Sequence, residues 1–317
     1  MINMNGKKII CWWSGGITSA VACKLAIDMF GSNNECRVIM IDTQNEDDDT
    51  YRFLKDCEAW YGIKIEMITA IDNGLPDREF IPIGRDYESI QDVWRKNKSL
   101  NVAMGAVCSS RLKQRVRDNW QKKNEFDHQV FGFEFERKEF NRAMSIKKSH
   151  PKAKGIFPLI MMGLDKEDCI QIVTDAGITI PRTYRLGFRN NNCFKTGCVQ
   201  GGIGYWQKMK VDFPDKFNTM ADMEHELTEL KGEPVTMLKD QGGEAKGVVK
   251  ETGLHWKQFI FLKKNPKYPE LKCIDDIRPR EVEPLVDCNG FCGTNDINPR
   301  IATELEINFD ATDDELF

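Results

Sequence analysis

Residues 7–19 read KKIICWWSGGITS, an apolar run that ends at a serine and two glycines. The apolar part has the length of one strand, and the residues after the glycines place Val21, Leu25 and Met29 at helical spacing. The segment therefore predicts a strand, a tight turn and a helix, in that order.

The same alternation continues along the chain. Residues 37–41 form a second apolar run, an amphipathic helix that contains Phe53 and Trp60 follows it, and residues 64–69 form a third run. Continuous apolar strands that alternate with helices are typical of a parallel sheet buried on both faces. The predicted fold class is α/β, a doubly wound parallel sheet followed by a smaller cysteine-bearing subdomain. Such sheets bind ligands at the carboxyl ends of their strands.

Composition excludes several classes of protein. With 317 residues, 41% hydrophobic and 30% charged, the chain is long enough for a core and typical of a folded, water-soluble protein. The net charge of −4 gives no overall field that would draw the chain onto nucleic acid, although local basic patches remain open. No apolar run reaches the length of a bilayer span, so we expect no membrane association and a cytoplasmic location. Eleven cysteines without an export signal indicate reduced thiols.

The strongest chemical signal lies in the turn between the first strand and its helix. Gly15 and Gly16 let the backbone approach an anion closely, and the hydroxyl groups of Ser14, Thr18 and Ser19 can donate hydrogen bonds. The N-terminus of the following helix adds about half a positive charge. The turn is neither a Walker A loop nor a dinucleotide fingerprint, because both glycine patterns are missing. It predicts a phosphate or pyrophosphate site, with a serine-capped glycine turn as the alternative.

A basic helix is predicted over residues 109–122. Arg111 and Arg115 lie four residues apart, as do Lys113 and Arg117, so the cations form two adjacent stripes that can meet phosphate or sulfate oxygens. An ordinary solvated face is the alternative.

Strand, Ser-Gly-Gly-x-x-Ser and helix together resemble the pyrophosphate-binding loop of the PP-loop superfamily, which includes ATP pyrophosphatases and the phosphoadenosine phosphosulfate (PAPS) reductase family. Three further elements follow in the order found in PAPS reductase-like proteins. Asp42-Thr43 with residues 49–53 is similar to their Asp-Thr-Gly…Glu-Thr segment. Residues 108–113 resemble Cys-Thr-x-x-Leu-Lys, and residues 132–142 resemble Gly-x-Arg-x-x-Glu-Ser-x-x-Arg.

The resemblance implies that the loop holds the phosphates of ATP or of a PAPS-like nucleotide and that the adenine lies near the end of the second strand. The nucleotide-binding residues that it implies are Ser14, Gly15, Gly16, Thr18, Ser19, Asp42, Thr43, Arg111, Lys113, Arg137 and Arg142. Residues 1–180 would be the nucleotide-binding domain, and residues 181–303 a C-terminal subdomain with a metal site. We expect an exposed loop at residues 241–250 and a disordered acidic tail at residues 304–317.

Four cysteines are candidate metal ligands. Cys193 and Cys198 flank a glycine turn, and Cys288 and Cys292 repeat that arrangement later in the chain. Four thiolates predict a Zn²⁺ site or a 4Fe–4S cluster, and buried free thiols are the alternative. The first pair lies in a segment that resembles a cysteine-bearing part of bacterial and phage PAPS reductase-like proteins, most of which carry Cys-x-x-Cys there. Cys108 precedes the basic helix and is a candidate reactive thiol, with a small buried residue as the alternative.

The expected function follows from this resemblance. An enzyme of the ATP-pyrophosphatase type cleaves ATP between the α- and β-phosphates, adenylates a substrate and passes it to a sulfur or nitrogen nucleophile. The acceptor is either a nucleic acid or a small molecule, and Mg²⁺ is expected, although Thr18 stands where many PP-loop enzymes carry aspartate. A PAPS or adenylylsulfate reductase is one alternative, for which the usual Glu-Cys-Gly-x-His segment is missing. A non-catalytic nucleotide-binding partner protein is the other.

Overall fold

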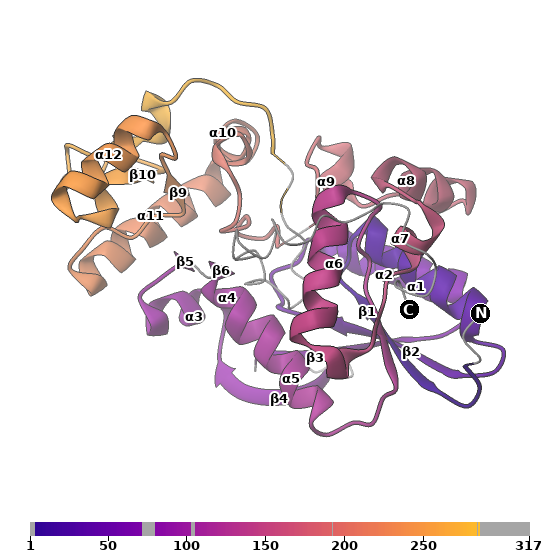
Figure 1. Cartoon of the computed structure of the whole chain (residues 1–317). Coiled ribbons are helices and arrows are strands. Elements are labelled where there is room, and N and C mark those ends of the chain that lie inside the picture. Colours follow the sequence, from indigo (N-terminus) through magenta and orange to yellow (C-terminus); the bar gives the residue numbers. More distant parts are fainter. Residues whose placement is uncertain (1–3, 72–79, 103–104, 192, 284, 286–317) are drawn as a thin grey trace.

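The computed structural model describes residues 4–71, 80–102, 105–191, 193–283 and 285 (Figure 1). Cys288, Cys292 and the expected acidic tail at residues 304–317 lie outside these ranges, so what the sequence predicts for them stays a prediction. No described helix is both long and apolar enough to span a lipid bilayer.

In the described residues, six strands of the first half of the chain form one parallel sheet in the order β4, β3, β2, β1, β7, β8. The strands are β1 Lys8–Trp13, β2 Glu35–Ile41, β3 Ile65–Ile71, β4 Phe80–Tyr87, β7 His128–Val130 and β8 Gly155–Ile156. From β1 the chain adds strands on one side and then returns to add β7 and β8 on the other. The strand order therefore reverses beside β1, and doubly wound sheets bind ligands at such a point.

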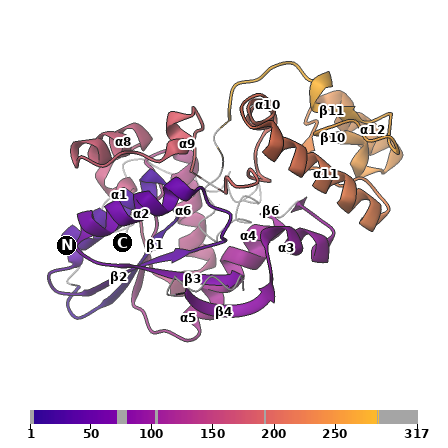
Figure 2. The ribbon, with the colours of Figure 1, turned by 180° about the vertical axis from the view of Figure 1, so that it is seen from behind.

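Helices cover both faces of this sheet, as Figures 1 and 2 show from opposite sides. Strand β1 alternates between the two resulting cores, with Ile9, Cys11 and Trp13 in one and Ile10 and Trp12 in the other. The first core contains α1 Ile17–Phe30, α2 Asp48–Tyr61, α7 Pro158–Met162 and α8 Lys166–Asp175, and the second contains α3 Ile90–Asn97, α5 Arg115–Gln121 and α6 Arg137–Ser149. The predicted doubly wound α/β fold is confirmed.

Helix boundaries follow local capping. Helix α8 begins at a capping box, in which Asp165 accepts from the Asp168 amide at 2.9 Å and Asp168 accepts from the Asp165 amide at 3.0 Å. The predicted basic helix consists of α4 Val107–Ser109, a π-helical turn at Ser110–Gln114 and α5.

The chain after residue 181 adds helices and a small sheet. These are α9 Arg182–Arg185, α10 Ile203–Asp212, α11 Pro214–Lys231 and α12 Gly243–Thr252, with strands β9 Leu238–Lys239, β10 Phe259–Phe261 and β11 Lys272–Cys273. A short hairpin, β5 Asn101–Val102 and β6 Gly105–Ala106, precedes α4. Trp206 and Phe217 share one hydrophobic cluster with Trp94 of α3, so the added elements continue the core of the sheet. The prediction of an exposed loop at residues 241–250 is wrong, because the helix α12 forms there. None of the side chains of α12 is buried.

Glu224 of α11 is a fully buried carboxylate that joins this helix to two later segments. One oxygen accepts from the Met237 amide at 2.8 Å and the other from the Leu262 amide at 2.7 Å. Burial raises the pKa of Glu224 to about 8, against the opposing effect of those two amides. The folded protein therefore holds a proton on Glu224 at pH values where the unfolded chain has lost it.

This difference predicts a pH dependence of stability. Since the folded state binds the extra proton, the free energy of unfolding should fall as pH rises from 5.5 to 8.5. The slope should be shallower in Glu224→Gln than in the wild type, measured by urea unfolding at each pH. Glu226→Gln on the same helix is the control, because Glu226 is exposed and its hydrogen bond to Arg95 lowers its pKa. Equal slopes in the wild type and Glu224→Gln would contradict this interpretation.

Candidate functional site

The loop of residues 14–19 lies at the carboxyl end of β1, between its neighbours β2 and β7. Gly15 has a φ of 87°, a conformation that favours glycine, and Gly16 precedes α1 as its N-cap. The loop therefore occupies the point of strand reversal, at the N-terminus of α1.

Ser19 holds the loop in shape. Its hydroxyl oxygen accepts from the Ser14 amide and from the Ser14 hydroxyl, both at 3.0 Å, and donates to the Gly16 carbonyl at 2.9 Å. Ser14 is half-buried, whereas Thr18 and Ser19 are almost fully buried. Of the three hydroxyl groups predicted at an anion site, that of Ser19 therefore organises the loop, and that of Ser14 lies nearest the surface.

Two close contacts fix the loop from either side. A Cβ atom on Gly132, just after β7, would lie 2.5 Å from the Ser19 Cα and 2.8 Å from the Thr18 carbonyl carbon. A Cβ atom on Gly15 would lie 2.8 Å from the Thr50 methyl group of α2. The first turn of α1 can approach β7 this closely only because residue 132 is a glycine.

A segment from far along the chain covers the loop. The Tyr184 hydroxyl accepts from the Ile17 amide at 3.3 Å, and the Asn191 side-chain amide donates to the Gly15 carbonyl at 2.8 Å. Arg182 pairs with Asp47 at 2.5 Å and anchors the same segment to the start of α2. One amide at the start of α1 is therefore already engaged by a tyrosine, which the sequence did not reveal.

At the end of β2, the structure separates the two predicted nucleotide-binding residues. Asp42 is fully buried, and its carboxylate accepts from the Tyr51 hydroxyl at 2.9 Å and from the Gln44 amide at 2.7 Å. Thr43 instead lines a cavity of 510 Å³, which we call the β2-end cavity. Thr43, rather than Asp42, is placed to contact a ligand there.

The β2-end cavity has polar walls from several elements. Residues 43–45 follow β2, Ser89 caps α3, and Lys195 and Lys216 bring two ammonium groups from the later part of the chain. Lys216 donates to the Phe194 carbonyl at 2.6 Å, and burial lowers the pKa of Lys216. Glu88 and Asp215 also line the cavity, so its two ammonium groups are matched by two carboxylates, and a cavity of this size with such walls suits a polar ligand.

Next to this cavity lies a buried acid–base pair. Glu46 is 1% exposed, and its Oε1 atom lies 3.8 Å from the ammonium group of Lys113, which is 6% exposed. Burial raises the pKa of Glu46 and outweighs the lowering effect of Lys113. Among the described residues, the Glu46 Oε2 atom has no hydrogen-bond partner.

The predicted cationic residues separate into buried and exposed groups. Lys113 is buried, while Arg111 is exposed and lies 3.5 Å from the Asn97 side-chain oxygen. Arg142 is buried, pairs with Glu139 at 3.1 Å and stacks over the ring of Phe133. Arg137 is exposed at the start of α6. Of these four residues, only Lys113 lines a second cavity, which is distinct from the β2-end cavity but also has Thr43 in its wall.

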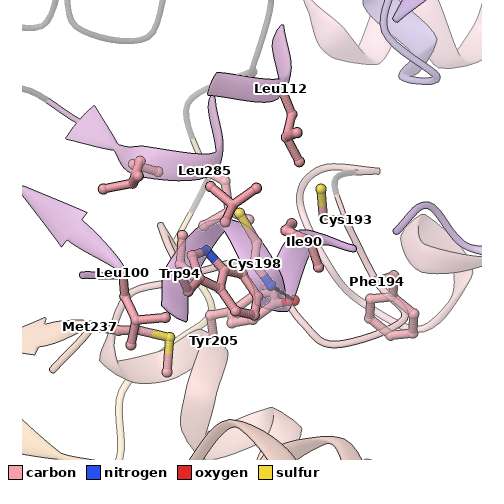
Figure 3. Close-up of a cluster of buried hydrophobic side chains, with 14 of the residues drawn as sticks. Ile90, Trp94, Leu100, Leu112, Cys193, Phe194, Cys198, Tyr205, Met237 and Leu285 are labelled. Atoms are coloured by element: carbon pink, nitrogen blue, oxygen red, sulfur yellow. Dashed lines mark hydrogen bonds between the residues drawn. The ribbon is translucent and has the colours of Figure 1, made fainter. Parts of the chain in front are cut away.

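That second cavity has a volume of only 10 Å³, and three thiols lie in its wall. Cys108, Cys193 and Cys198 all line it, and Figure 3 shows the last two beside Trp94 and Ile90. Burial raises the pKa of Cys193 well above its ordinary value, which disfavours a thiolate there. Within the described ranges, no group of three or more cysteine, histidine or carboxylate side chains is arranged to hold a metal ion. The sequence paired Cys193 and Cys198 with Cys288 and Cys292, which lie outside those ranges, and missed their approach to Cys108.

A family model for the phosphoadenosine phosphosulfate reductase domain matches residues 8–197. Among solved structures, the PAPS reductase from Candida auris in its phosphate complex is similar, with 15% identity, a TM-score of 0.36 and coverage of 59% of this chain and 81% of that chain. The U34-tRNA thiolase NcsA from Methanococcus maripaludis, solved with its 4Fe–4S cluster, has 15% identity, a TM-score of 0.36 and coverage of 82% of both chains. No curated protein matches the sequence.

Proposed function

Because the chain belongs to the phosphoadenosine phosphosulfate reductase domain family, we propose that its loop of residues 14–19 binds the phosphates of an adenine nucleotide. The observation that carries this proposal is the position of the loop, at the strand reversal of a parallel sheet and at the N-terminus of α1. The β2-end cavity, with Thr43 in its wall, would take the adenosine or the acceptor.

The reaction that we propose is cleavage of ATP between its α- and β-phosphates. A substrate oxygen attacks the α-phosphorus, the bond to the β-phosphate oxygen breaks, and pyrophosphate leaves while the substrate becomes adenylated. A sulfur or nitrogen nucleophile then displaces AMP from the activated substrate. This chemistry depends on positioning and charge neutralisation, which loop amides, the Ser14 hydroxyl and the two cavity lysines can supply. Mg²⁺ would be bound chiefly by the phosphates, since no described cluster is arranged to hold a metal ion.

A thiol-dependent reductase is the second candidate, because Cys108, Cys193 and Cys198 line a cavity that also contains Thr43. Those thiols would then lie near a nucleotide bound at the end of β2. The buried position of Cys193 opposes this role, since its raised pKa leaves little thiolate to attack sulfur. A binding-only protein is the third candidate, favoured by Thr18 in the loop and by the tyrosine on the Ile17 amide.

One set of assays separates the three. The full chain is incubated with α-labelled ATP and Mg²⁺, with transfer RNA or small-molecule acceptors. The label measures AMP, and the unlabelled pyrophosphate is measured separately. We expect both products in equal amounts, dependent on an acceptor. Sulfite released from PAPS with reduced thioredoxin, and lost in Cys108→Ser, would instead identify a reductase. Nucleotide binding without either product would identify a binding protein.

The metal proposal concerns Cys193, Cys198, Cys288 and Cys292. Two of these thiols line one cavity, and soft thiolate ligands suit Zn²⁺ or a 4Fe–4S cluster. Metal analysis and a visible spectrum of anaerobically purified protein test it. Zinc gives a colourless protein and a cluster gives a brown one. Protein that carries neither metal would show free cysteines instead.

Removing the Tyr184 hydroxyl should strengthen nucleotide binding. A phosphate oxygen can accept from the Ile17 amide only after this hydroxyl leaves it. Tyr184→Phe should therefore bind ATP roughly three- to ten-fold more tightly in calorimetric titrations, the worth of about one hydrogen bond. Tyr205→Phe is the control, because its hydroxyl accepts from the Cys198 amide away from the loop. Weaker binding by Tyr184→Phe would show that the hydroxyl helps to bind the nucleotide.

A further inference from the structure

A separate cavity of 270 Å³ lies at the amino ends of the strands, on the side of the sheet opposite to the loop of residues 14–19. Met4 precedes β1, His128 begins β7 and Gly155 begins β8, so all three lie at the amino ends of the strands. The loop of residues 14–19 lies at the carboxyl ends. The two sites therefore lie at opposite ends of the strands of one sheet, and the proposed nucleotide site shares no residue with this cavity.

Four basic side chains line the cavity over an apolar floor. His128, Lys147, His150 and Lys154 come from β7, the last turn of α6 and the segment before β8. The floor is made by Met4, Gly155 and Ile156, which are all buried. Among the described residues that line the cavity, none carries a carboxylate. The wall is thus cationic and the base is hydrophobic.

Burial disfavours the charged form of two of these basic side chains. Burial lowers the pKa of Lys147 and of His128, and a hydrogen bond to the Lys154 backbone offsets part of the lowering at His128. Asp127 raises the pKa of His128, but its carboxylate accepts from the Lys8 amide at 2.9 Å and from Lys7 at 3.5 Å. A bound anion would oppose this lowering, because a negative charge nearby favours the charged form of a basic group.

The end of α6 gives a simpler reason for cations, since helix carbonyl ends attract positive charge. That reason applies equally to Lys148 and Lys152, which lie in the same stretch, are exposed and do not line the cavity. Lys147 and Lys154 differ from them because they line the same cavity as His128 and His150. Lys154 adopts a left-handed φ of 41°, and its amide donates to the Pro151 carbonyl at 3.3 Å, which fixes the turn that presents it.

We propose that this cavity binds the phosphate group of a small phosphorylated organic molecule, whose apolar part rests on Met4 and Ile156. Lysine and imidazolium groups supply charge-assisted hydrogen bonds to phosphate oxygens. A cavity of 270 Å³ has room for a single small ligand. The site does not depend on the proposed function of the loop.

The test observes the cavity itself, because phosphate could also bind the loop. The side-chain resonances of His128 and His150 are assigned with His→Gln variants and followed by nuclear magnetic resonance at pH 6.5. Inorganic phosphate and phenyl phosphate are then added to the full chain. We expect saturable shifts of both histidines, with phenyl phosphate binding several-fold more tightly than inorganic phosphate because of the apolar floor.

Matched variants separate a site from a basic surface. Lys147→Gln with Lys154→Gln should weaken phenyl phosphate binding about ten-fold, the loss expected for charge-assisted contacts. Lys148→Gln with Lys152→Gln removes the same charge outside the cavity and should leave binding unchanged. Absence of saturable shifts, or equal weakening by both pairs, would overturn the proposal. A single-stranded oligonucleotide is titrated in the same way. If it shifts the same histidine resonances and binds more tightly than phenyl phosphate, the small-molecule assignment is overturned.

Discussion

Gly132→Ala is expected to abolish nucleotide binding and to destabilise the protein. The added Cβ atom would lie 2.5 to 2.8 Å from backbone atoms of Thr18 and Ser19, and a backbone cannot rotate away as a side chain can. The first turn of α1 must therefore move, and the loop of residues 14–19 moves with it. Overpacking of this kind costs about 3 kcal/mol. Urea unfolding and a calorimetric titration with ATP measure the two effects.

Gly247→Ala is the matched control for this substitution. Gly247 lies in the exposed helix α12, and a Cβ atom there meets nothing within 4 Å. This variant should bind ATP as the wild type does and gain about 0.5 to 1 kcal/mol of stability, since alanine favours helix. If Gly132→Ala kept its affinity for ATP, the loop would not need its close approach to β7.

The second large effect is expected from Lys113→Met. This change removes the cation beside Glu46, which is 1% exposed and whose pKa is already raised by burial. The Thr43 hydroxyl would still donate to Glu46 at 3.0 Å, but leaving a buried carboxylate without its counter-charge costs about 3 kcal/mol. The loss should be largest at pH 8 and smaller at pH 5, because Glu46 takes up a proton as pH falls and no longer carries a buried charge.

Two comparisons isolate the pair. Glu46→Gln combined with Lys113→Met should recover much of the lost stability at pH 8, because the buried charge is then absent. Lys195→Met is the control, since Lys195 lies at the same 3.8 Å from an acid, Asp48, that is 89% exposed. Exposed pairs contribute little. A loss in Lys113→Met that does not vary with pH would show that the cation acts through packing alone.

Those parts of the fold that depend on local pattern could be predicted from the sequence. Ile9 to Trp13 alternates between two cores because β1 is buried on both faces, and a continuous apolar run is the signature of such a strand. Asp165 and Asp168 predict the start of α8 because a capping box needs only two residues three apart. The glycine pair after β1 likewise marks the loop without any knowledge of the rest.

Contacts that complete the candidate site could not be predicted in this way. Tyr184 reaches Ile17 from 167 residues away, and a hydroxyl that accepts from one amide leaves no spacing pattern in the sequence. Cys108 meets Cys193 and Cys198 only because α4 packs beside the turn that carries them. The split between buried Lys113 and exposed Arg111 also depends on which helix face the sheet covers.

The loop and its cover together suggest how the site would work. Arg182, Tyr184 and Asn191 hold one segment against α2 and the loop through separate hydrogen bonds. We infer that a nucleotide must displace at least the Tyr184 contact, so binding and movement of this segment would be coupled. The strengthening expected of Tyr184→Phe is the simplest sign of that coupling.

A crystal structure with α,β-methylene ATP tests the central claim most directly. We predict phosphate oxygens within hydrogen-bonding distance of the backbone amides of residues 15–19, with the Tyr184 hydroxyl withdrawn from the Ile17 amide. A nucleotide bound elsewhere on the chain, or a loop still covered by Tyr184 at saturating nucleotide, would contradict it.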